Sequence, residues 1–152
     1  MLPWIQIDSA KAPGGGELRL MRRSDEFSIT IGGNELMNSR LSGSEEALAQ
    51  LACERIRGRR APKLLIGGLG MGFTLRAALA ELGADAAITV AELVPAIVRW
   101  ARGPMADIFG DCLDDPRVAI HEGDVGQLMR ASRSRFDAIL LDVDNGPDGL
   151  TS

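Results

Sequence analysis

The stretch Leu64-Leu65-Ile66-Gly67-Gly68-Leu69-Gly70-Met71-Gly72 decides the fold of this chain. Three large apolar residues predict a buried strand, and they lead directly into a cluster of glycines. After the glycines, Leu75, Leu79 and Leu82 recur at helical spacing, and Gly83 ends the pattern. Glycines between a strand and a helix permit a tight turn and a close approach of the backbone to a ligand. We therefore predict a ligand-binding turn between a strand and a helix.

The spacing of the glycines separates two classes of ligand. The dinucleotide pattern G-x-G-x-x-G needs a further glycine at position 73 or 75, where this chain has Phe73 and Leu75. A phosphate-binding loop needs Gly-Lys-Ser or Gly-Lys-Thr, which does not follow either. The remaining pattern is G-x-G-x-G at Gly68, Gly70 and Gly72. This pattern alone also fits a plain turn that only joins a strand to a helix.

Three more apolar segments continue the alternation of strand and helix. The predicted strands are Ile88-Thr89-Val90, Val118-Ala119-Ile120 and Ala138-Ile139-Leu140-Leu141. Pro95 is expected to start a helix with Ile97, Val98 and Ala101 facing inward. Apolar strands without alternation, separated by helices, indicate a parallel sheet that is covered on both faces. We therefore predict an α/β fold of the nucleotide-binding type for residues 61–152, which stops after its fourth strand.

Residues 1–41 are predicted to form a small N-terminal β segment. Phe27, Ile29 and Ile31 alternate with polar residues, as expected for a half-buried strand. Glycine clusters at 14–16 and 32–33 predict turns. The chain is expected to be a fragment of a longer protein, because a sheet of four strands is small for this type of fold.

A linking helix and a basic segment are predicted over residues 42–60. Ser42 and Glu45 have the spacing of a capping box at the start of the helix. The apolar face is expected to consist of Leu48, Leu51, Ala52 and Ile56. Arginines then cluster near the end of the helix. A solvated helix end is the preferred interpretation of this cluster, and a contact with a polyanion is the alternative.

The composition excludes several classes of protein. The chain has 152 residues, of which 45% are hydrophobic and 25% charged, and this balance is typical of an ordered globular domain. Its apolar runs are much shorter than the roughly 20 residues that span a bilayer, and we expect no secretory leader. The net charge of −4 argues against a nucleic-acid partner. Cys53 and Cys112 suggest neither a metal site nor a disulfide framework, so we predict a cytoplasmic protein.

Acidic residues follow two of the predicted strands. Glu92 ends the second strand, where its carboxylate can accept hydrogen bonds from the hydroxyls of a ribose. Asp124 follows the third strand, where it can accept a hydrogen bond from an adenine amino group. A helix N-cap or a solvated loop carboxylate is the alternative interpretation of each acid. Met71 and Trp100 are candidates for an adenine pocket, although core packing is the preferred interpretation of both.

The run from Leu64 to Asp148 resembles the polyamine aminopropyltransferases, the spermidine synthase-like branch of the class I S-adenosylmethionine-binding fold. That family has Ile-Gly-Gly-Gly-Asp-Gly-Gly after a strand, then Val-Glu-Ile-Asp-Pro, Asp-Pro-Arg-Val, Gly-Asp-Ala and an Asp-containing loop before Gly-Pro. The corresponding segments of this chain are 66–72, Ala91-Glu92-Leu93-Val94-Pro95, Asp115-Pro116-Arg117-Val118, Gly123-Asp124-Val125 and Asp142-Val143-Asp144-Asn145-Gly146-Pro147. The resemblance implies a Rossmann-like parallel sheet of the class I S-adenosylmethionine-dependent methyltransferase type, here truncated after the fourth strand. The small N-terminal β segment suits the family's leading domain.

The resemblance also implies a function and a site. The co-substrate would be S-adenosylmethionine or its decarboxylated form, without a metal, and the second substrate a small amine or polyamine. The residues expected to bind the nucleoside are Gly68, Gly70, Gly72, Glu92, Leu93, Asp124 and Val125. Asp142 corresponds to the general base of aminopropyl transfer, and Asp142 and Asp144 would hold the amine. The family further implies a homodimer, and the charge and the short apolar runs predict neither a nucleic-acid nor a membrane partner.

Three departures from the family pattern keep other functions open. Gly70 stands where the family has an acid that holds the transferred chain, and the loop after Asp142 is one residue shorter. The family's Tyr-Gln pair is missing near Ser44 and Glu45, and the chain has no tyrosine. The alternatives are an S-adenosylmethionine-dependent methyltransferase and a non-catalytic nucleoside-binding or interaction protein. We expect the full-length protein, rather than this 152-residue form, to carry the activity.

Overall fold

The computed structural model describes residues 2–40, 43–131 and 135–141, which fall into two compact units. One unit holds the described residues up to Arg40, and the other holds those from Gly43 onward. None of the helices in the described ranges is long and apolar enough to span a membrane. Each unit has its own sheet, and the site considered below belongs to the second unit.

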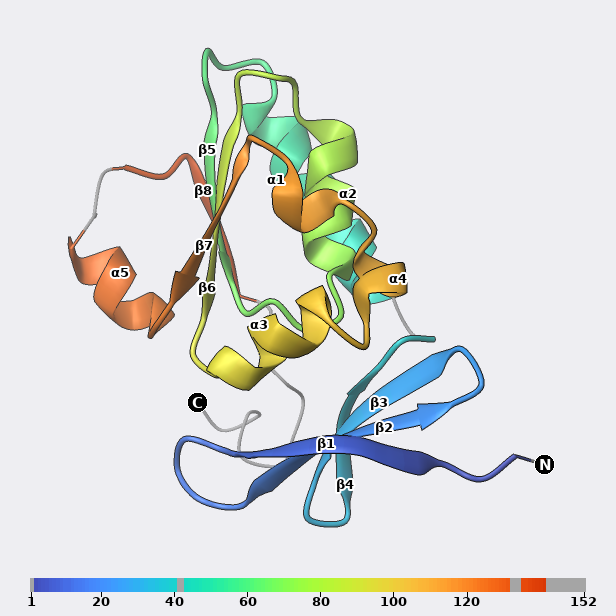
Figure 1. The fold of residues 1–152 in the computed structure, drawn as a ribbon. Helices are drawn as coiled ribbons and strands as arrows, with labels where there is room; N and C mark the ends of the chain where they lie inside the picture. Colours follow the sequence, from blue (N-terminus) through green and yellow to red (C-terminus); the bar gives the residue numbers. More distant parts are fainter. Residues whose placement is uncertain (1, 41–42, 132–134, 142–152) are drawn as a thin grey trace. The chain divides into compact units, whose positions relative to one another are not determined.

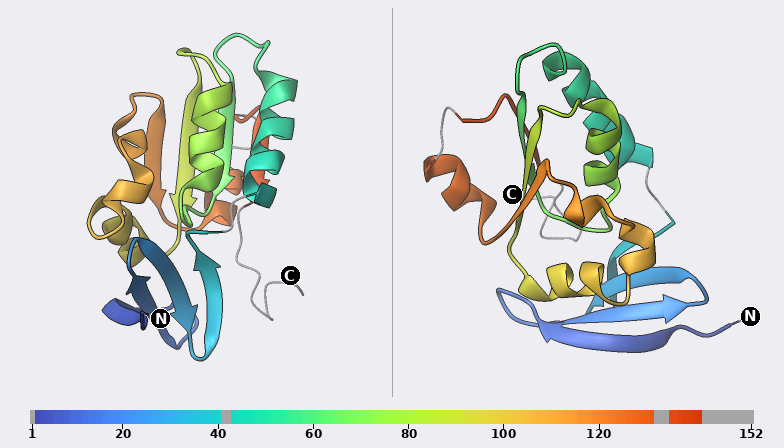
Figure 2. Two further views of the ribbon diagram at one scale, coloured as in Figure 1. Left: turned by 90° about the vertical axis from the view of Figure 1, so that its right-hand side faces the viewer. Right: turned by 45° about the horizontal axis from the view of Figure 1, so that its top comes forward.

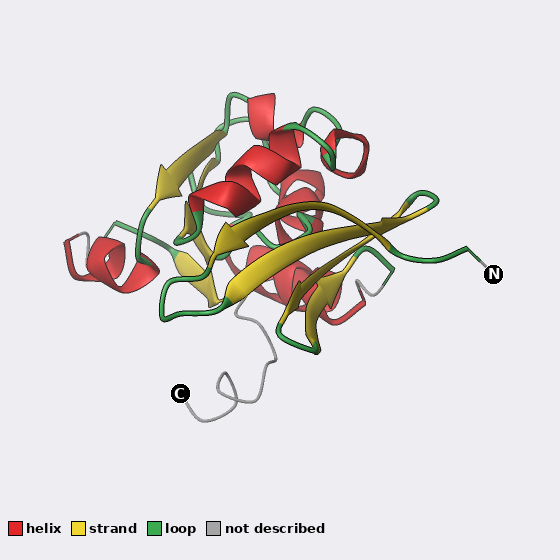
Figure 3. Cartoon of the chain, turned by 60° about the horizontal axis from the view of Figure 1, so that its bottom comes forward, coloured by secondary structure: helices red, strands yellow, loops and turns green. Residues whose placement is uncertain are grey.

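The first unit is an antiparallel sheet of four strands in the order β1-β2-β3-β4. Successive strands are joined as hairpins (Figure 3). Their bounds are β1 Ile5–Lys11, β2 Glu17–Arg23, β3 Glu26–Ile31 and β4 Asn34–Asn38. Leu18 and Leu20 of β2 are buried, and so are Phe27 and Ile29 of β3. The predicted alternation of β3 holds only in part, because Ser28 is buried as well and Ile31 is half-buried. The sequence analysis missed β4, since its residues include no β-branched or aromatic side chain.

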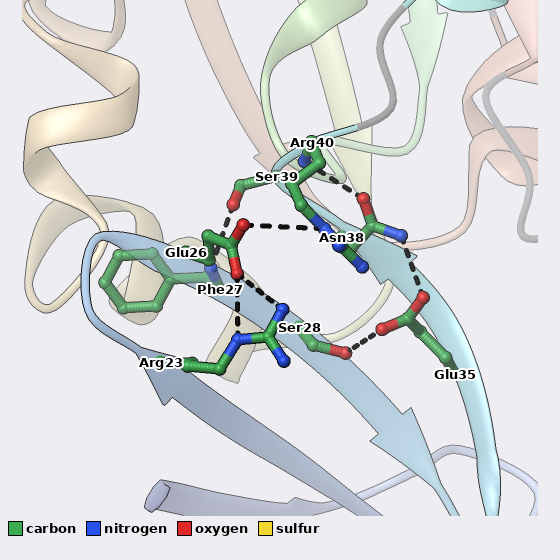
Figure 4. A network of polar contacts seen from close by, with 8 residues as sticks. All are labelled: Arg23, Glu26, Phe27, Ser28, Glu35, Asn38, Ser39 and Arg40. Carbon is green, nitrogen blue, oxygen red and sulfur yellow. Dashed lines mark hydrogen bonds and ion pairs between the residues drawn. The ribbon is translucent and has the colours of Figure 1, made fainter. Parts of the chain in front are cut away.

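A polar network fixes the pairing of β3 with β4 (Figure 4). The Glu35 carboxylate accepts hydrogen bonds from the Ser28 hydroxyl and the Asn38 amide. The Ser39 hydroxyl accepts a further hydrogen bond from the Phe27 backbone N–H at 2.8 Å. Burial raises the pKa of Glu35, but the hydrogen bonds from Ser28 and Asn38 outweigh it and hold this pKa below its usual value. Ser28 and Asn38 are buried, so these bonds satisfy polar groups that would otherwise oppose folding.

The second unit is a parallel sheet of four strands in the order β7-β6-β5-β8. Its strands are β5 Lys63–Gly67, β6 Ala87–Glu92, β7 Val118–Glu122 and β8 Ala138–Leu141. Its helices are α1 Gly43–Ile56, α2 Phe73–Glu81, α3 Pro95–Arg102, α4 Ala106–Phe109, the 3₁₀ turn η1 Cys112–Asp114, and α5 Val125–Ala131. Helices α1 and α2 lie on one face of the sheet and α5 on the other (Figures 1 and 2). The predicted order of parallel strands and helices is confirmed.

The coverage of this sheet differs from the prediction. Helix α5 has seven residues, and none of them is buried. On β8, Ile139 is 39% exposed and Leu141 is 51% exposed, although the sequence predicted a strand that is buried on both sides. The reason is that one helix is about 10 Å wide, so it covers about two strands spaced about 4.8 Å apart and not all four.

The core of the second unit lies between the sheet and helices α1 to α3. Leu64, Leu65 and Ile66 of β5 are almost fully buried. The prediction for α3 is confirmed, because Pro95 is its first residue and the three predicted inward residues are buried. The predicted face of α1 is wrong for Leu48 and Leu51, which are exposed, and confirmed for Ile56, which is buried together with Ala49 and Cys53. These three share one helical face, but two of them are small, so the larger leucines misled the prediction.

The Asp115-Pro116-Arg117-Val118 motif connects β7 to the end of α2. The Arg117 guanidinium donates two hydrogen bonds to the Asp115 carboxylate, at 3.0 and 2.9 Å. It also donates to the carbonyl oxygens of Leu79 at 3.1 Å and Leu82 at 2.8 Å. Leu79 lies in the last turn of α2 and Leu82 is its C-cap, where the carbonyl groups have no further intrahelical donors. Hydrogen bonds from Arg117 lower the pKa of Asp115 to about 2. The motif is therefore a helix cap in this fold.

Replacing Arg117 by alanine is expected to lower the free energy of unfolding by about 1–3 kcal/mol, because carbonyl groups of α2 lose their donor. The Asp115 pKa lies below its usual 3.8, so its contribution is present above about pH 4 and is lost as the pH falls toward 2. The variant should therefore show a weaker dependence of stability on pH in this range. Urea unfolding at several pH values measures both effects. Arg99→Ala on the exposed side of α3 is the control, and an equal loss in both variants would contradict the capping role.

Candidate nucleoside-binding site

The carboxyl ends of the parallel strands meet at one edge of the sheet. Gly67 of β5 pairs in register with Ala91 of β6 and with Leu141 of β8, and Glu92 pairs with Glu122 of β7. The backbone N–H of Gly68 donates to the Ala91 carbonyl at 2.7 Å. The residues that follow these strands are therefore neighbours, as the topological rule for ligand sites in α/β sheets requires.

The glycine turn after β5 is held by its two apolar residues. Leu69 is 2% exposed and Met71 is 3% exposed, so both side chains are buried. Gly68, Gly70 and Gly72 have φ angles of 106°, 55° and 82°, in the region that favours glycine. The alternation thus buries the two side chains and leaves Gly68 and Gly70 half-exposed. Core packing is the preferred interpretation of Met71 from the sequence, and its burial supports that interpretation.

Two further glycine contacts define the shape of the turn. A Cβ atom on Gly72 would lie 2.6 Å from Cε2 of the buried Phe109 ring. A Cβ atom on Gly67 would lie 3.0 Å from both Val125 Cγ2 and Leu141 Cδ2. Val125 therefore lies against the end of β5, while Phe109 packs behind the start of α2. No signal in the sequence pointed to Phe109, because it is far from the glycines along the chain.

Glu92 lies buried between the glycine turn and α3. Glu92 as a whole is 6% exposed, and it ends β6 as predicted. Oε1 accepts a hydrogen bond from the Leu69 backbone N–H at 2.9 Å, and Oε2 accepts one from the Val94 N–H at 3.0 Å. Each carboxylate oxygen has two acceptor positions, so each keeps one for a hydroxyl donor. The arrangement can bind the two hydroxyls of a ribose without breaking either backbone bond.

Asp124 follows β7, the next strand of the sheet, and serves as the N-cap of α5. Its Oδ1 accepts a hydrogen bond from the Gly126 N–H at 3.0 Å. The backbone joins this turn to Glu92, because the Gly123 N–H donates to the Glu92 carbonyl at 2.9 Å. The capping role that the sequence analysis held as an alternative is therefore present. Asp124 is half-buried, and its second oxygen can still accept a hydrogen bond from a ligand.

Some of the remaining predicted site residues are described by the structure, and others are not. Leu93 follows Glu92 and is 52% exposed, as an apolar contact for a ligand ring would be. Trp100 is 1% exposed, which supports core packing over an adenine pocket. Asp142 and Asp144 lie outside the described residues. The structure thus brings together the glycine turn, Glu92 and the Asp124 turn.

Neither a metal site nor a reactive thiol is found at this edge within the described ranges. These residues contain no group of three or more His, Cys, Asp or Glu that could hold a metal ion. Burial raises the pKa of Cys53 to about 11 and raises that of Cys112 as well, so both thiols stay neutral near pH 7. A shallow hollow beside α2 is lined by Arg76 and residues of the α4–η1 segment, and it includes none of the predicted site residues.

In this parallel sheet, a glycine turn follows one strand, a buried acid follows the neighbouring strand, and a second acid follows the next. This arrangement defines the Rossmann-like class of nucleotide-binding folds. No family model matches the chain. Over 90 residues the chain is 34% identical to Polyamine aminopropyltransferase 1 of Streptomyces coelicolor. This alignment covers 58% of the chain and 17% of that protein.

Solved structures share the fold. The spermidine synthase of Thermotoga maritima superposes with a TM-score of 0.72 at 22% identity. A spermidine synthase in complex with the transition-state analogue AdoDATO also gives 0.72, at 21% identity. Each match covers 90% of this chain but 47% of the other, so the chain spans about half the length of these structures. The resemblance to the spermidine synthase-like family is confirmed, and the chain shares the Rossmann-like fold of these spermidine synthases.

Proposed function

We propose that this chain forms the nucleoside-binding part of a spermidine synthase-like aminopropyltransferase. The ligand would be decarboxylated S-adenosylmethionine, S-adenosylmethionine or methylthioadenosine. The observation that carries the proposal is Glu92, a buried carboxylate between the glycine turn and α3 with acceptor positions left for two hydroxyls. The presence of AdoDATO in a spermidine synthase of the same fold supports it. Leu93 would contact the adenine ring, and Asp124 its amino group.

The transfer itself needs a base beside the nucleoside. An amine nitrogen attacks the carbon next to the sulfonium, a new C–N bond forms, and the C–S bond breaks with its electron pair staying on sulfur. The products are a neutral thioether and a substituted amine. A protonated amine must first lose a proton, and we assign its acceptance to Asp142, the residue that follows β8. Asp144 would help to hold the cationic amine. We expect the protein to act as a cytoplasmic homodimer.

A methyltransferase is the second candidate, and Gly70 is the observation in its favour. The family pattern that the chain resembles has an acid at this position, and its absence would remove a partner for the amino group of the aminopropyl chain. Gly70 also has a φ angle of 55°, so a side chain here would be strained. With ordinary S-adenosylmethionine as donor, the same nucleophilic step would deliver a methyl group.

The proposal is tested by calorimetric titration with methylthioadenosine, S-adenosylmethionine and its decarboxylated form. We expect dissociation constants between about 1 µM and 1 mM, the usual range for enzyme substrates. Tighter binding of the decarboxylated form would favour aminopropyl transfer, and tighter binding of S-adenosylmethionine would favour methyl transfer. Binding of none of the three would contradict both enzyme functions and leave an interaction module.

Two exposed leucines provide a matched pair for the same titration. Leu93 is 52% exposed at the proposed site, and Leu48 is 49% exposed on α1. Leu93→Ala is expected to weaken binding by roughly 5- to 20-fold, because it removes an apolar contact worth about 1–2 kcal/mol. Leu48→Ala should leave the affinity unchanged. Equal effects of the two substitutions would argue against a nucleoside at this edge of the sheet.

A further inference from the structure

Glu92 differs from the other charged residues that the structure describes, because it alone is buried. A buried carboxylate is costly unless its oxygens are hydrogen-bonded. Its two partners are backbone N–H groups of two different segments, Leu69 in the glycine turn and Val94 before α3. The carboxylate therefore joins these segments whether or not a ligand is bound.

Besides Glu92, the glycine turn is restrained by the buried Met71 side chain and by the Gly72 N–H, which donates to the Leu69 carbonyl at 3.0 Å. Leu69 lies between Gly68 and Gly70, which have no side chains that restrict their backbone. The turn is tied to the sheet by the Gly68 N–H bond to Ala91, by the buried side chain of Leu69, and by the Leu69 N–H bond to Glu92. Of these, only the bond to Glu92 involves a charged group, and such bonds are about twice as strong as neutral ones.

We propose that Glu92 is a positioning residue that holds the glycine turn in its ligand-binding conformation before any ligand arrives. This inference rests on the proposed function, since it assigns the turn to the nucleoside site. The role requires a hydrogen-bond acceptor for each of the two backbone N–H donors. Only a carboxylate on a side chain of this length supplies both. A glutamine offers one oxygen, so its NH₂ group would face one of the two N–H donors. An aspartate is one methylene shorter and cannot reach both.

Glu92→Gln separates positioning from direct binding of a ribose. A glutamine can still donate to and accept from hydroxyl groups, so a residue that only bound the ribose would tolerate this change. We expect instead that the Leu69 amide proton exchanges with solvent roughly 10- to 100-fold faster in the ligand-free variant, as the loss of a hydrogen bond to a charged group implies. The affinity for methylthioadenosine should fall by a similar factor.

Amide exchange followed by NMR in the 152-residue protein measures the effect without ligand. The Ile66 amide, on buried β5, reports global opening and should not change. Glu122→Gln is the matched control, because Glu122 pairs in register with Glu92 but is exposed. Glu92→Asp should accelerate Leu69 exchange as Glu92→Gln does. In the wild-type protein the Leu69 amide should be protected without ligand, a measurement that needs no variant.

Three outcomes would overturn the inference. The first is rapid exchange of Leu69 in the ligand-free wild-type protein. The second is unchanged Leu69 exchange in Glu92→Gln with weakened binding of methylthioadenosine, which would leave the proposed function intact. The third is equal acceleration at Leu69 and Ile66, which would mean general destabilisation. If Leu69 alone accelerates but the wild-type protein binds none of the three nucleosides, the positioning role stands and the proposed function fails.

Discussion

The Gly72→Ala variant is expected to lose about 2–5 kcal/mol of its free energy of unfolding. Gly72 has a φ angle of 82°, where an alanine costs about 1–2 kcal/mol in backbone strain. The new methyl group would also lie 2.6 Å from the Phe109 ring, and such overpacking of a core costs about 1–3 kcal/mol. Because a whole domain has only about 5–15 kcal/mol, this is a large part of the total.

Urea unfolding of two further variants separates the strain from the overlap. Gly32 also has a left-handed φ of 59°, but a Cβ atom there meets nothing within 4 Å. Gly32→Ala should therefore show the strain alone. Combining Gly72→Ala with Phe109→Leu should relieve part of the overlap, so that the double variant is less destabilised than the two single losses added together. Strict additivity would show that the ring does not oppose the methyl group.

The Gly72→Ala variant should also bind methylthioadenosine at least 10-fold more weakly. Gly72 is the N-cap of α2, and Leu69 accepts its N–H at 3.0 Å, so any shift of Gly72 moves the glycine turn. A 10-fold loss corresponds to about 1.4 kcal/mol, which is less than the expected total destabilisation of about 2–5 kcal/mol. If the variant is destabilised as expected but keeps its full affinity, the conformation of the glycine turn does not depend on the start of α2.

The parallel sheet was predictable because its signals are local. Short apolar runs such as Leu64-Leu65-Ile66 predict buried strands, and Pro95 marks the first residue of a helix. The prediction failed where packing partners decided the outcome. Leu48 and Leu51 have the right spacing for a buried face, but α1 instead buries Ala49 and Cys53. The small residues let the helix approach α2, and this fit is invisible in a list of hydrophobic positions.

For the site, the sequence predicted which residues follow the ends of the strands. The position of Glu92 after β6 followed from the strand pattern, and Asp124 followed from β7 in the same way. The partners of Glu92 did not follow, because the Leu69 and Val94 N–H groups are backbone atoms that carry no sequence signature. Nor did the contact of Gly72 with Phe109, which depends on how the α4 segment folds back. The roles of the site residues in binding remain predictions.

Replacing Asp142 by asparagine is expected to lower the rate of aminopropyl transfer by about 10²- to 10⁴-fold, the usual contribution of a general base. Asp142 itself lies outside the described residues, and its assignment rests on the family resemblance and on chain order. It follows Leu141, which pairs in register with Gly67 at the start of the glycine turn. Asparagine has almost the same shape but accepts no proton, so the affinity for methylthioadenosine should change by less than about twofold.

The dependence of the rate on pH distinguishes a base from a residue that only holds the amine. An alkyl amine has a pKa near 10, as for lysine, so without a base the reactive neutral amine becomes about tenfold more abundant with each pH unit. The Asp142→Asn rate should therefore rise by about tenfold per unit between pH 7 and 9, while the wild-type rate rises less. The assay uses decarboxylated S-adenosylmethionine and a diamine, with Asp107→Asn on exposed α4 as the control. Unchanged turnover in Asp142→Asn would remove this residue from the mechanism, whereas a lower rate with a parallel pH profile would reduce it to holding the cation.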